Sequence, residues 1–117
     1  MNFEQEFALL QEGRILDENV ITLDDLTIDI PKQKVTKGKR DVYLTRKEFM
    51  LLECLMKNNP NVVSRGKIMD YVWNNDTDPL SNTVEAHILN LRKKIEKGKK
   101  KIIHTVSGRG YKADTER

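Results

Sequence analysis

The amino-acid sequence predicts an α+β fold in which short antiparallel strands, three helices and a C-terminal β-hairpin follow one another. Three observations lead to this prediction. Apolar and polar residues alternate over residues 14–44, as they do in strands with one buried face. From Thr45 onward the apolar residues recur every three or four positions, which is typical of amphipathic helices. The glycine-containing segment 107–110 then separates two short strand-like stretches.

The N-terminal part of the chain is predicted to contain a linker and a cluster of strands. Residues 1–13 carry several acids and no strong helix cap, so we interpret them as a linker or N-terminal extension, with residues 14–117 as the domain. Three or four short strands fit residues 14–44, with turns at 24–25, 31–32 and 37–39. The alternating apolar positions are Ile21, Leu23, Leu26, Ile28, Ile30, Val42 and Leu44.

Two of the three predicted helices begin at hydroxyl side chains that suit an N-terminal cap. Thr45 and Glu48 form a capping-box pattern, in which the hydroxyl accepts from the third amide and the carboxylate reaches back. An Asn-Asn-Pro sequence at 58–60 ends this helix. Ser64 can cap a second, shorter helix that contains Trp73. Asn74 to Pro79 form a polar loop after it.

The third predicted helix begins at Ser81 or Asn82 and extends to about residue 97. A rotation of about 100° per residue places its side chains on two adjacent stripes. The stripe expected to face the core holds Val84, Ile88, Leu91 and Ile95. The polar stripe holds Thr83, His87, Asn90, Lys94 and Lys97. Such a mixture of hydrogen-bonding and basic groups suits a helix in the DNA major groove, and a solvated helix face is the alternative.

The polar stripe provides groups that suit both bases and phosphates. Asn90 can pair with adenine through two hydrogen bonds, Thr83 can meet a phosphate or a thymine methyl, and His87 can meet a phosphate or a base edge. Phosphate contacts add affinity without sequence information. The lysines expected at phosphates are Lys93, Lys94 and Lys97.

Arg92 and Glu85 have competing predicted roles. Arg92 projects away from Asn90, so a salt bridge to Glu85 or Glu96 competes with a phosphate contact. Glu85 also lies three residues after Asn82 and can complete a capping box there.

The charge distribution indicates a polyanionic partner. The net charge of +3 combines eight acids and one base in residues 1–31 with ten acids and twenty bases in the rest of the chain. Residues 92–112 hold nine bases and one acid, a net charge of +8. A concentration of this kind indicates nucleic acid, and a solvated lysine-rich surface is the alternative.

Composition and residue types argue against an enzyme and against a membrane protein. His87, His104 and Cys54 lack metal-ligand spacing, and Cys54 lies among leucines, where a buried structural cysteine is expected. There is no phosphate-binding loop, so we expect no metal, no cofactor and no catalytic residue. No apolar run approaches the roughly 20 residues that span a membrane, and we expect a cytoplasmic protein.

Four segments together resemble the winged-helix effector domains of the OmpR/PhoB type, in matching order and spacing over about residues 20–113. They are residues 44–52, residues 63–73, residues 82–95 and residues 105–111. The resemblance implies a winged helix-turn-helix with a four-stranded N-terminal antiparallel sheet and a three-helix core. It implies a recognition helix at about 82–97 in the major groove, and a hairpin wing at about 101–113 toward the minor groove. It also implies the output domain of a two-component response regulator, which acts in a phosphorelay and regulates transcription.

The resemblance also assigns residues to contacts. Its base-contacting positions correspond to Thr83, His87, Asn90 and, with the stripe above, Lys94. The resemblance implies phosphate contacts at Trp73, Thr105 and Tyr111. Further phosphate or wing contacts are expected at Asn82, Arg92, Lys93, Lys97 and Arg109. The loop expected to face RNA polymerase contains Asn74, Asn75, Asp76 and Asp78.

Three positions depart from the pattern of the family. Leu89 and Asn90 stand where some members have arginines, so an adenine preference at Asn90 is a hypothesis from its donor geometry. Ser107 stands where some members insert an arginine into the minor groove, and Arg109 is the candidate to replace it.

The resemblance further implies partners. Family members bind direct repeats in double-stranded DNA as head-to-tail pairs, and an isolated effector domain is expected to be monomeric. The chain has no room for the receiver domain of such a regulator, which we expect outside this sequence. The alternative function is a winged-helix module for protein contacts, with its basic face on an acidic partner.

Overall fold

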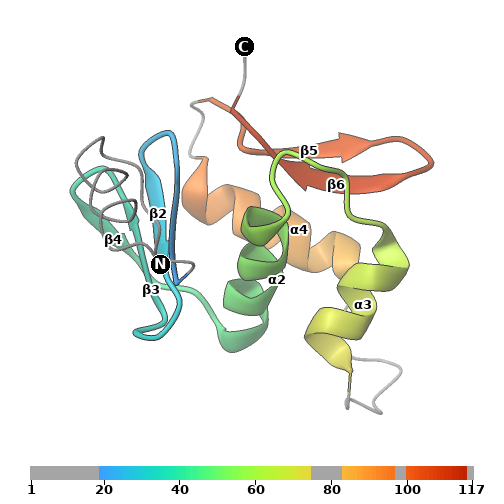
Figure 1. The fold of residues 1–117 in the computed structure, drawn as a ribbon, viewed down its shortest axis with the longest axis horizontal. Coiled ribbons are helices and arrows are strands. Elements are labelled where there is room, and N and C mark those ends of the chain that lie inside the picture. The colour runs from blue at the N-terminus through green and yellow to red at the C-terminus, as the bar shows by residue number, and fades with distance from the viewer. Residues whose placement is uncertain (1–18, 75–82, 97–99, 116–117) are drawn as a thin grey trace, which may run out of the picture.

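The computed structural model describes residues 19–74, 83–96 and 100–115, and these begin with a four-stranded antiparallel sheet. The strands follow one another in the order β1-β2-β3-β4, each paired with the next (Figure 1). They are β1 (Val20–Leu23), β2 (Leu26–Asp29), β3 (Lys34–Lys37) and β4 (Arg40–Val42). The predicted N-terminal sheet is therefore confirmed.

The turns of this sheet lie close to the predicted positions. Asp24, Gln33 and Gly38 adopt positive φ angles of 60°, 52° and 64°, one in each connection between consecutive strands. Polar residues and glycine tolerate this left-handed backbone. Short turns fix the strand register, and Leu26 and Ile28 of β2 are consequently fully buried.

The described residues contain three helices, and each begins at a hydroxyl cap. They are α2 (Arg46–Lys57), α3 (Arg65–Trp73) and α4 (Val84–Ile95). The Thr45 hydroxyl accepts from the Glu48 amide at 3.2 Å and the Glu48 carboxylate accepts from the Thr45 amide at 3.0 Å, so the predicted capping box is confirmed. Ser64 caps α3 as predicted, by accepting from the Lys67 amide.

Helix α4 begins at a later residue than predicted. Its N-cap is Thr83, whose hydroxyl accepts from the Ala86 amide at 3.1 Å. The predicted first residues, Ser81 and Asn82, lie outside the described residues, as does Lys97 at the predicted end. The last turn closes at Glu96, whose amide donates to the Arg92 carbonyl.

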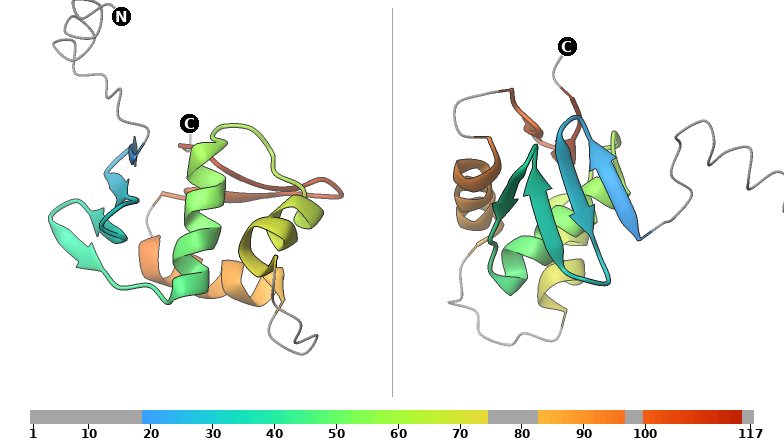
Figure 2. Two further views of the ribbon diagram at one scale, coloured as in Figure 1. Left: turned by 60° about the horizontal axis from the view of Figure 1, so that its bottom comes forward. Right: turned by 90° about the vertical axis from the view of Figure 1, so that its left-hand side faces the viewer.

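A C-terminal hairpin of β5 (Ile103–Val106) and β6 (Gly110–Ala113) packs across the helices. Val63, in the connection between α2 and α3, pairs with Tyr111 through two backbone hydrogen bonds of 2.7 and 3.0 Å. Figure 2 shows the sheet on one side of the three helices and the hairpin reaching past them on another. The predicted hairpin is confirmed, and it is anchored to the helical core.

The core lies where the helices meet the sheet and the hairpin. Leu51, Leu52, Ile68 and Leu91 are fully buried there. Cys54 is only 2% exposed, and burial raises the pKa of its thiol to about 11. The prediction of a buried structural cysteine is confirmed, because a thiol with this pKa carries little thiolate at neutral pH.

Candidate nucleic-acid interface

Helix α4 is held firmly on one side and exposed on the other. Its predicted core stripe is confirmed, since all four of its side chains are buried; these are Val84, Ile88, Leu91 and Ile95. The exposed side carries Glu85, Leu89, Asn90 and Lys93, with Ala86 half-buried among them. A rigid helix therefore presents a polar surface with one leucine in it.

His87 does not lie on this exposed surface. Its side chain is 8% exposed, and its ring meets the Trp73 ring edge-to-face with 5.0 Å between centroids. Its Nδ1 lies 3.0 Å from the Thr83 carbonyl oxygen. The predicted placement of His87 on the solvent-facing stripe is wrong, because the α3 indole extends the buried side of α4 beyond the four aliphatic residues.

Lys94 lies on the predicted stripe, but its ammonium is paired with a carboxylate of α2. Its Nζ lies 2.6 Å from Glu48 Oε1, and the Glu48 side chain is almost completely buried at the start of α2. Burial by itself raises the pKa of this carboxyl. The hydrogen bonds from Lys94 and from the Thr45 amide outweigh burial, so that the pKa is lowered overall. Lys94 thus neutralises a buried carboxylate, and the predicted base-contacting role does not suit it.

Thr83 and Asn90 lie on the exposed side of α4. The Thr83 hydroxyl accepts from the Ala86 amide and donates to the Glu85 carboxylate. The Asn90 side chain is exposed and has no hydrogen bond to the described part of the chain. Of the four predicted base-contacting residues, these two are the ones placed as expected.

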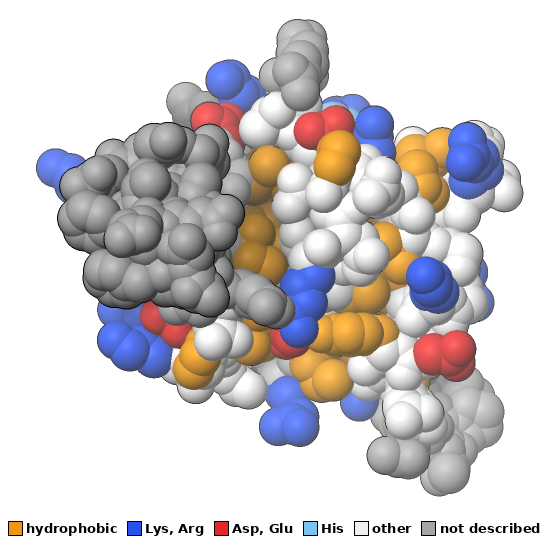
Figure 3. All heavy atoms as spheres, viewed as in Figure 1, with side chains coloured by type: hydrophobic (Ala, Val, Ile, Leu, Met, Phe, Trp, Pro, Cys, Tyr) orange, Lys and Arg blue, Asp and Glu red, His pale blue; other side chains and the backbone are white. Residues whose placement is uncertain are grey.

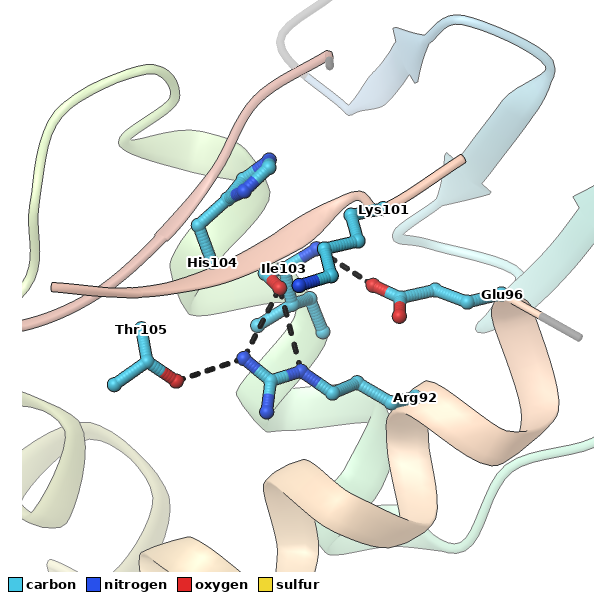
Figure 4. A pocket seen from close by; sticks show the side chains of 6 residues that line it. All are labelled: Arg92, Glu96, Lys101, Ile103, His104 and Thr105. Carbon is cyan, nitrogen blue, oxygen red and sulfur yellow. Dashed lines mark hydrogen bonds between the residues drawn. The ribbon is translucent and has the colours of Figure 1, made fainter. Parts of the chain in front are cut away.

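Arg92 joins α4 to the hairpin, as Figure 4 shows. Its guanidinium donates to the Ile103 carbonyl from Nε at 3.3 Å and Nη2 at 3.1 Å, and Nη2 also donates to Thr105 Oγ1 at 2.8 Å. Because the Thr105 oxygen accepts here, its hydroxyl proton is free for another acceptor. Arg92 therefore helps to hold Thr105 in position and occupies one acceptor site of its hydroxyl.

Neither of the predicted salt bridges of Arg92 forms. Glu85 instead pairs with Arg65 of α3, with oxygen–nitrogen distances of 2.8 and 3.2 Å. Glu96 accepts from the Ile102 and Ile103 amides, each at 2.9 Å. Both predictions assumed partners within α4, whereas the actual partners come from α3 and the hairpin.

The hairpin and α3 enclose a cleft of about 430 Å³ next to α4. Arg109 stands exposed at the hairpin turn, and Thr105 and Tyr111 line the same cleft with Arg65. Figure 3 shows basic side chains at the outer end of the hairpin and at the lower edge of the same view. The predicted wing residues Thr105, Arg109 and Tyr111 are therefore gathered on one side of the hairpin.

Trp73 has an unusual indole group. The ring is 6% exposed with the Lys47 ammonium 5.8 Å from its centroid, and its Nε1–H has no acceptor among the described residues. A buried donor without a partner is costly, and this indole is therefore a candidate donor to an external acceptor.

Asn74 is exposed at the end of α3. The other predicted loop residues lie outside the described residues; these are Asn75, Asp76 and Asp78.

The sequence reasoning gave no role to Leu89, which is 54% exposed, and it did not predict the Arg65–Glu85 pair. The sequence did contain a signal for Leu89, because it follows Ile88 of the core stripe and therefore points away from the core.

The part of the chain that the structure describes holds no group of three metal-ligating side chains. It also holds no helix with the length and hydropathy to cross a bilayer.

Comparison with known proteins gives one consistent result. The family model described as "Transcriptional regulatory protein, C terminal" matches residues 38–113. The response regulator MprA of Mycobacterium ulcerans is 39% identical over 103 residues, which are 87% of this chain and 44% of that protein. This chain thus spans about half the length, or less, of the curated relatives that it matches.

Solved structures agree with the sequence relatives. The DNA-binding domain of CpxR from E. coli superimposes with a TM-score of 0.71 at 28% identity, covering 84% of this chain and 98% of that one. The Klebsiella pneumoniae RstA DNA-binding domain, solved in complex with RstA box, has a TM-score of 0.70 at 26% identity, covering 81% and 96%. The chain therefore belongs to the OmpR/PhoB-type winged-helix DNA-binding domains of response regulators, which are transcription-factor domains and not enzymes.

Proposed function

We propose that this domain binds a specific double-stranded DNA sequence with α4 in the major groove and the β5–β6 hairpin directed to the minor groove. The observation that carries the proposal is the exposed side of α4. It holds Asn90 and Lys93 with their polar ends free of the core, on a helix that the buried stripe keeps rigid. The RstA DNA-binding domain, solved in complex with RstA box, supports DNA binding by a domain of this fold.

The proposed contacts follow from the positions described above. Asn90 pairs with an adenine, since its amide has one donor and one acceptor side for the adenine N6 and N7. Phosphates accept from Thr83, Thr105, Tyr111 and the Trp73 indole, whose N–H has no acceptor among the described residues, while Lys93 supplies charge. Arg109, at the turn of the hairpin, is directed to the minor groove. Asn82 and Lys97 remain proposed phosphate contacts outside the described residues.

The wider role follows from membership of the family. We propose that two copies bind a direct repeat head to tail, and that the full-length cytoplasmic protein carries a receiver domain that controls the DNA-binding domain. We also propose that the segment after α3 faces RNA polymerase. Of its residues, Asn74 lies at the exposed end of α3.

The function is tested by selecting bound duplexes from a random pool and measuring their affinity. Asn90→Ala should weaken binding to the selected site about tenfold or more and relax the preference for adenine at one position, because a good bidentate pair is worth about 1–3 kcal/mol. Binding to random duplex should change little. Fluorescence anisotropy at fixed salt measures both affinities.

Lys39→Ala is the matched control, because Lys39 is exposed in the β3–β4 turn, away from α4. This variant should keep both affinities. Wild-type affinity that is equal for any polyanion, or that is insensitive to salt, would contradict DNA recognition and favour a protein-contact module.

Arg92→Lys should separate positioning from charge at the junction of α4 and the hairpin. Lysine keeps the charge but lacks the fork that bonds both the Ile103 carbonyl and the Thr105 hydroxyl. We expect a loss of about 1 kcal/mol in the free energy of unfolding, and severalfold weaker DNA binding with an unchanged salt slope. Urea denaturation and anisotropy at several salt concentrations measure these effects. Full affinity in the lysine variant would show that Arg92 acts as a phosphate contact and not through Thr105.

A further inference from the structure

Leu89 is an aliphatic residue of α4 that is 54% exposed. The large exposed hydrophobic residues among the described positions are Tyr43, Tyr71 and Leu89. Each tyrosine has a hydroxyl for water or protein, and Tyr71 donates its hydroxyl to Glu53 at 2.6 Å. Leu89 has no polar group, so hydrogen bonding to water or protein does not explain why it is exposed.

Core packing does not explain this exposure either. Leu89 belongs neither to the buried core cluster nor to the half-buried residues packed against it. Successive positions on a helix differ by about 100°, so Leu89 points well away from the core stripe that contains Ile88 and Leu91. The side chain therefore extends from the same surface as Asn90 and Lys93.

Ala86 enlarges this apolar spot. It stands three residues before Leu89, at a spacing that makes two helical residues neighbours on the surface. At about 100° per residue, Lys93 falls in the same sector of the helix one turn after Leu89, and Asn90 lies beside Ala86. The result is a small apolar spot next to a hydrogen-bonding group and a cation.

This spot matches one chemical group of the major groove. The thymine 5-methyl is the apolar group that base edges present there, and it distinguishes thymine from cytosine and uracil. We infer that Leu89, supported by Ala86, contacts the 5-methyl group of a thymine next to the adenine that Asn90 pairs with. The inference rests on the proposed function, and it adds a base preference that hydrogen bonds alone do not explain.

The test removes single methyl groups from the DNA. In the site selected by the wild-type chain, each thymine in turn is replaced by deoxyuridine, and affinity is measured by anisotropy at fixed salt. We expect about three- to fivefold weaker binding at one or two adjacent positions, the effect of exposing about one methyl group. At the same positions, a duplex with 5-methylcytosine should bind more tightly than the same duplex with cytosine, because it carries the methyl group.

The protein variants then identify the residue responsible. Leu89→Ala should bind the thymine site about as weakly as the wild type binds the deoxyuridine site, and should lose its sensitivity to deoxyuridine at that position. Lys93→Ala is the matched control from the same surface: it should weaken binding to all duplexes and keep the deoxyuridine effect. Thermal denaturation should show that both variants fold, since both side chains are exposed.

The outcomes separate this inference from the proposed function. An enriched site in which no deoxyuridine substitution matters overturns the thymine contact and leaves DNA recognition standing. A deoxyuridine effect that persists unchanged in Leu89→Ala also overturns it, because another residue then contacts the methyl group. A pool that yields no enriched site overturns both proposals.

Discussion

Gly110→Ala should be the most destabilising single methyl addition among the described glycines of the chain. A β-carbon at Gly110 would lie 2.1 Å from the Val63 carbonyl oxygen and 2.9 Å from Ser64 Cα, and φ is +142° there. These are backbone atoms, which cannot move aside as the end of a side chain can. Relieving the contact requires breaking the hydrogen bonds between Val63 and Tyr111. We expect a loss of about 3 kcal/mol in the free energy of unfolding and a Tm lower by more than ~10 °C.

Two other glycines provide matched controls. Gly108 has φ of +75° but nothing within 4 Å of its added β-carbon, so Gly108→Ala should cost only about 1–2 kcal/mol. Gly66 lies in the first turn of α3 with open space around it, and Gly66→Ala should be neutral or stabilising by up to ~1 kcal/mol. Calorimetry should therefore rank the variants in this order. Equal losses at Gly108 and Gly110 would show that backbone strain, and not the contact with Val63, is the cause.

The helix starts were predictable because their causes are local. Thr45 and Ser64 each accept from an amide three residues later, and this pattern is visible in the sequence. The same holds for the turn at Gly38, where the backbone needs a residue that tolerates positive φ. Wherever cause and effect lie within a few residues, sequence reasoning located the element to within one or two positions.

Strand β3 shows where local reasoning weakens. Val35 is its single apolar residue, so no alternation is visible over Lys34–Lys37. Val35 is nonetheless buried, because it pairs with Ile28 in β2 and with Val42 in β4. Burial of this strand comes from its neighbours in the sheet, and this is why the sequence allowed either three or four strands.

The face of α4 was mispredicted for a related physical reason. Helical geometry gives the angles between side chains but not the width of the sector that other elements cover. Three side chains of α4 are engaged by other parts of the chain: His87 packs against Trp73, Lys94 pairs with Glu48, and Arg92 donates to the Ile103 carbonyl. The exposed surface is consequently turned toward Leu89 and Lys93, with Asn90 kept at its margin.

Glu48→Ala should cause the second large loss of stability, because it removes two interactions at once. The carboxylate accepts from the Thr45 amide and from Lys94 Nζ at 2.6 Å, while its side chain is almost completely buried. We expect the free energy of unfolding to fall by about 2–3 kcal/mol, with contributions from the cap and from a charge-assisted hydrogen bond. The loss should be smaller than for a fully buried pair, because the Lys94 side chain is 38% exposed and can turn to water.

Glu48→Gln is the matched variant, since an amide can still complete a capping box but carries no charge. We expect it to lose about 1 kcal/mol at neutral pH, which isolates the ion pair between α2 and α4. In a double-mutant cycle, Lys94→Met should have little additional effect once Glu48 is glutamine. An additive result would show that Lys94 and Glu48 do not stabilise each other.

Glu48→Gln also tests how the free energy of unfolding depends on pH. The pKa of Glu48 is lowered from its ordinary value of 4.5, because the hydrogen bonds from Lys94 and the Thr45 amide outweigh the opposing effect of burial. A carboxylate with a depressed folded-state pKa contributes its full stabilisation above the unfolded-state pKa, and loses it as pH falls through the folded-state pKa. The difference in unfolding free energy between wild type and Glu48→Gln should therefore be constant from pH 6 to pH 8 and shrink below about pH 4.5. A difference that stayed the same down to pH 3 would mean that the charge of Glu48 does not hold α4 against α2.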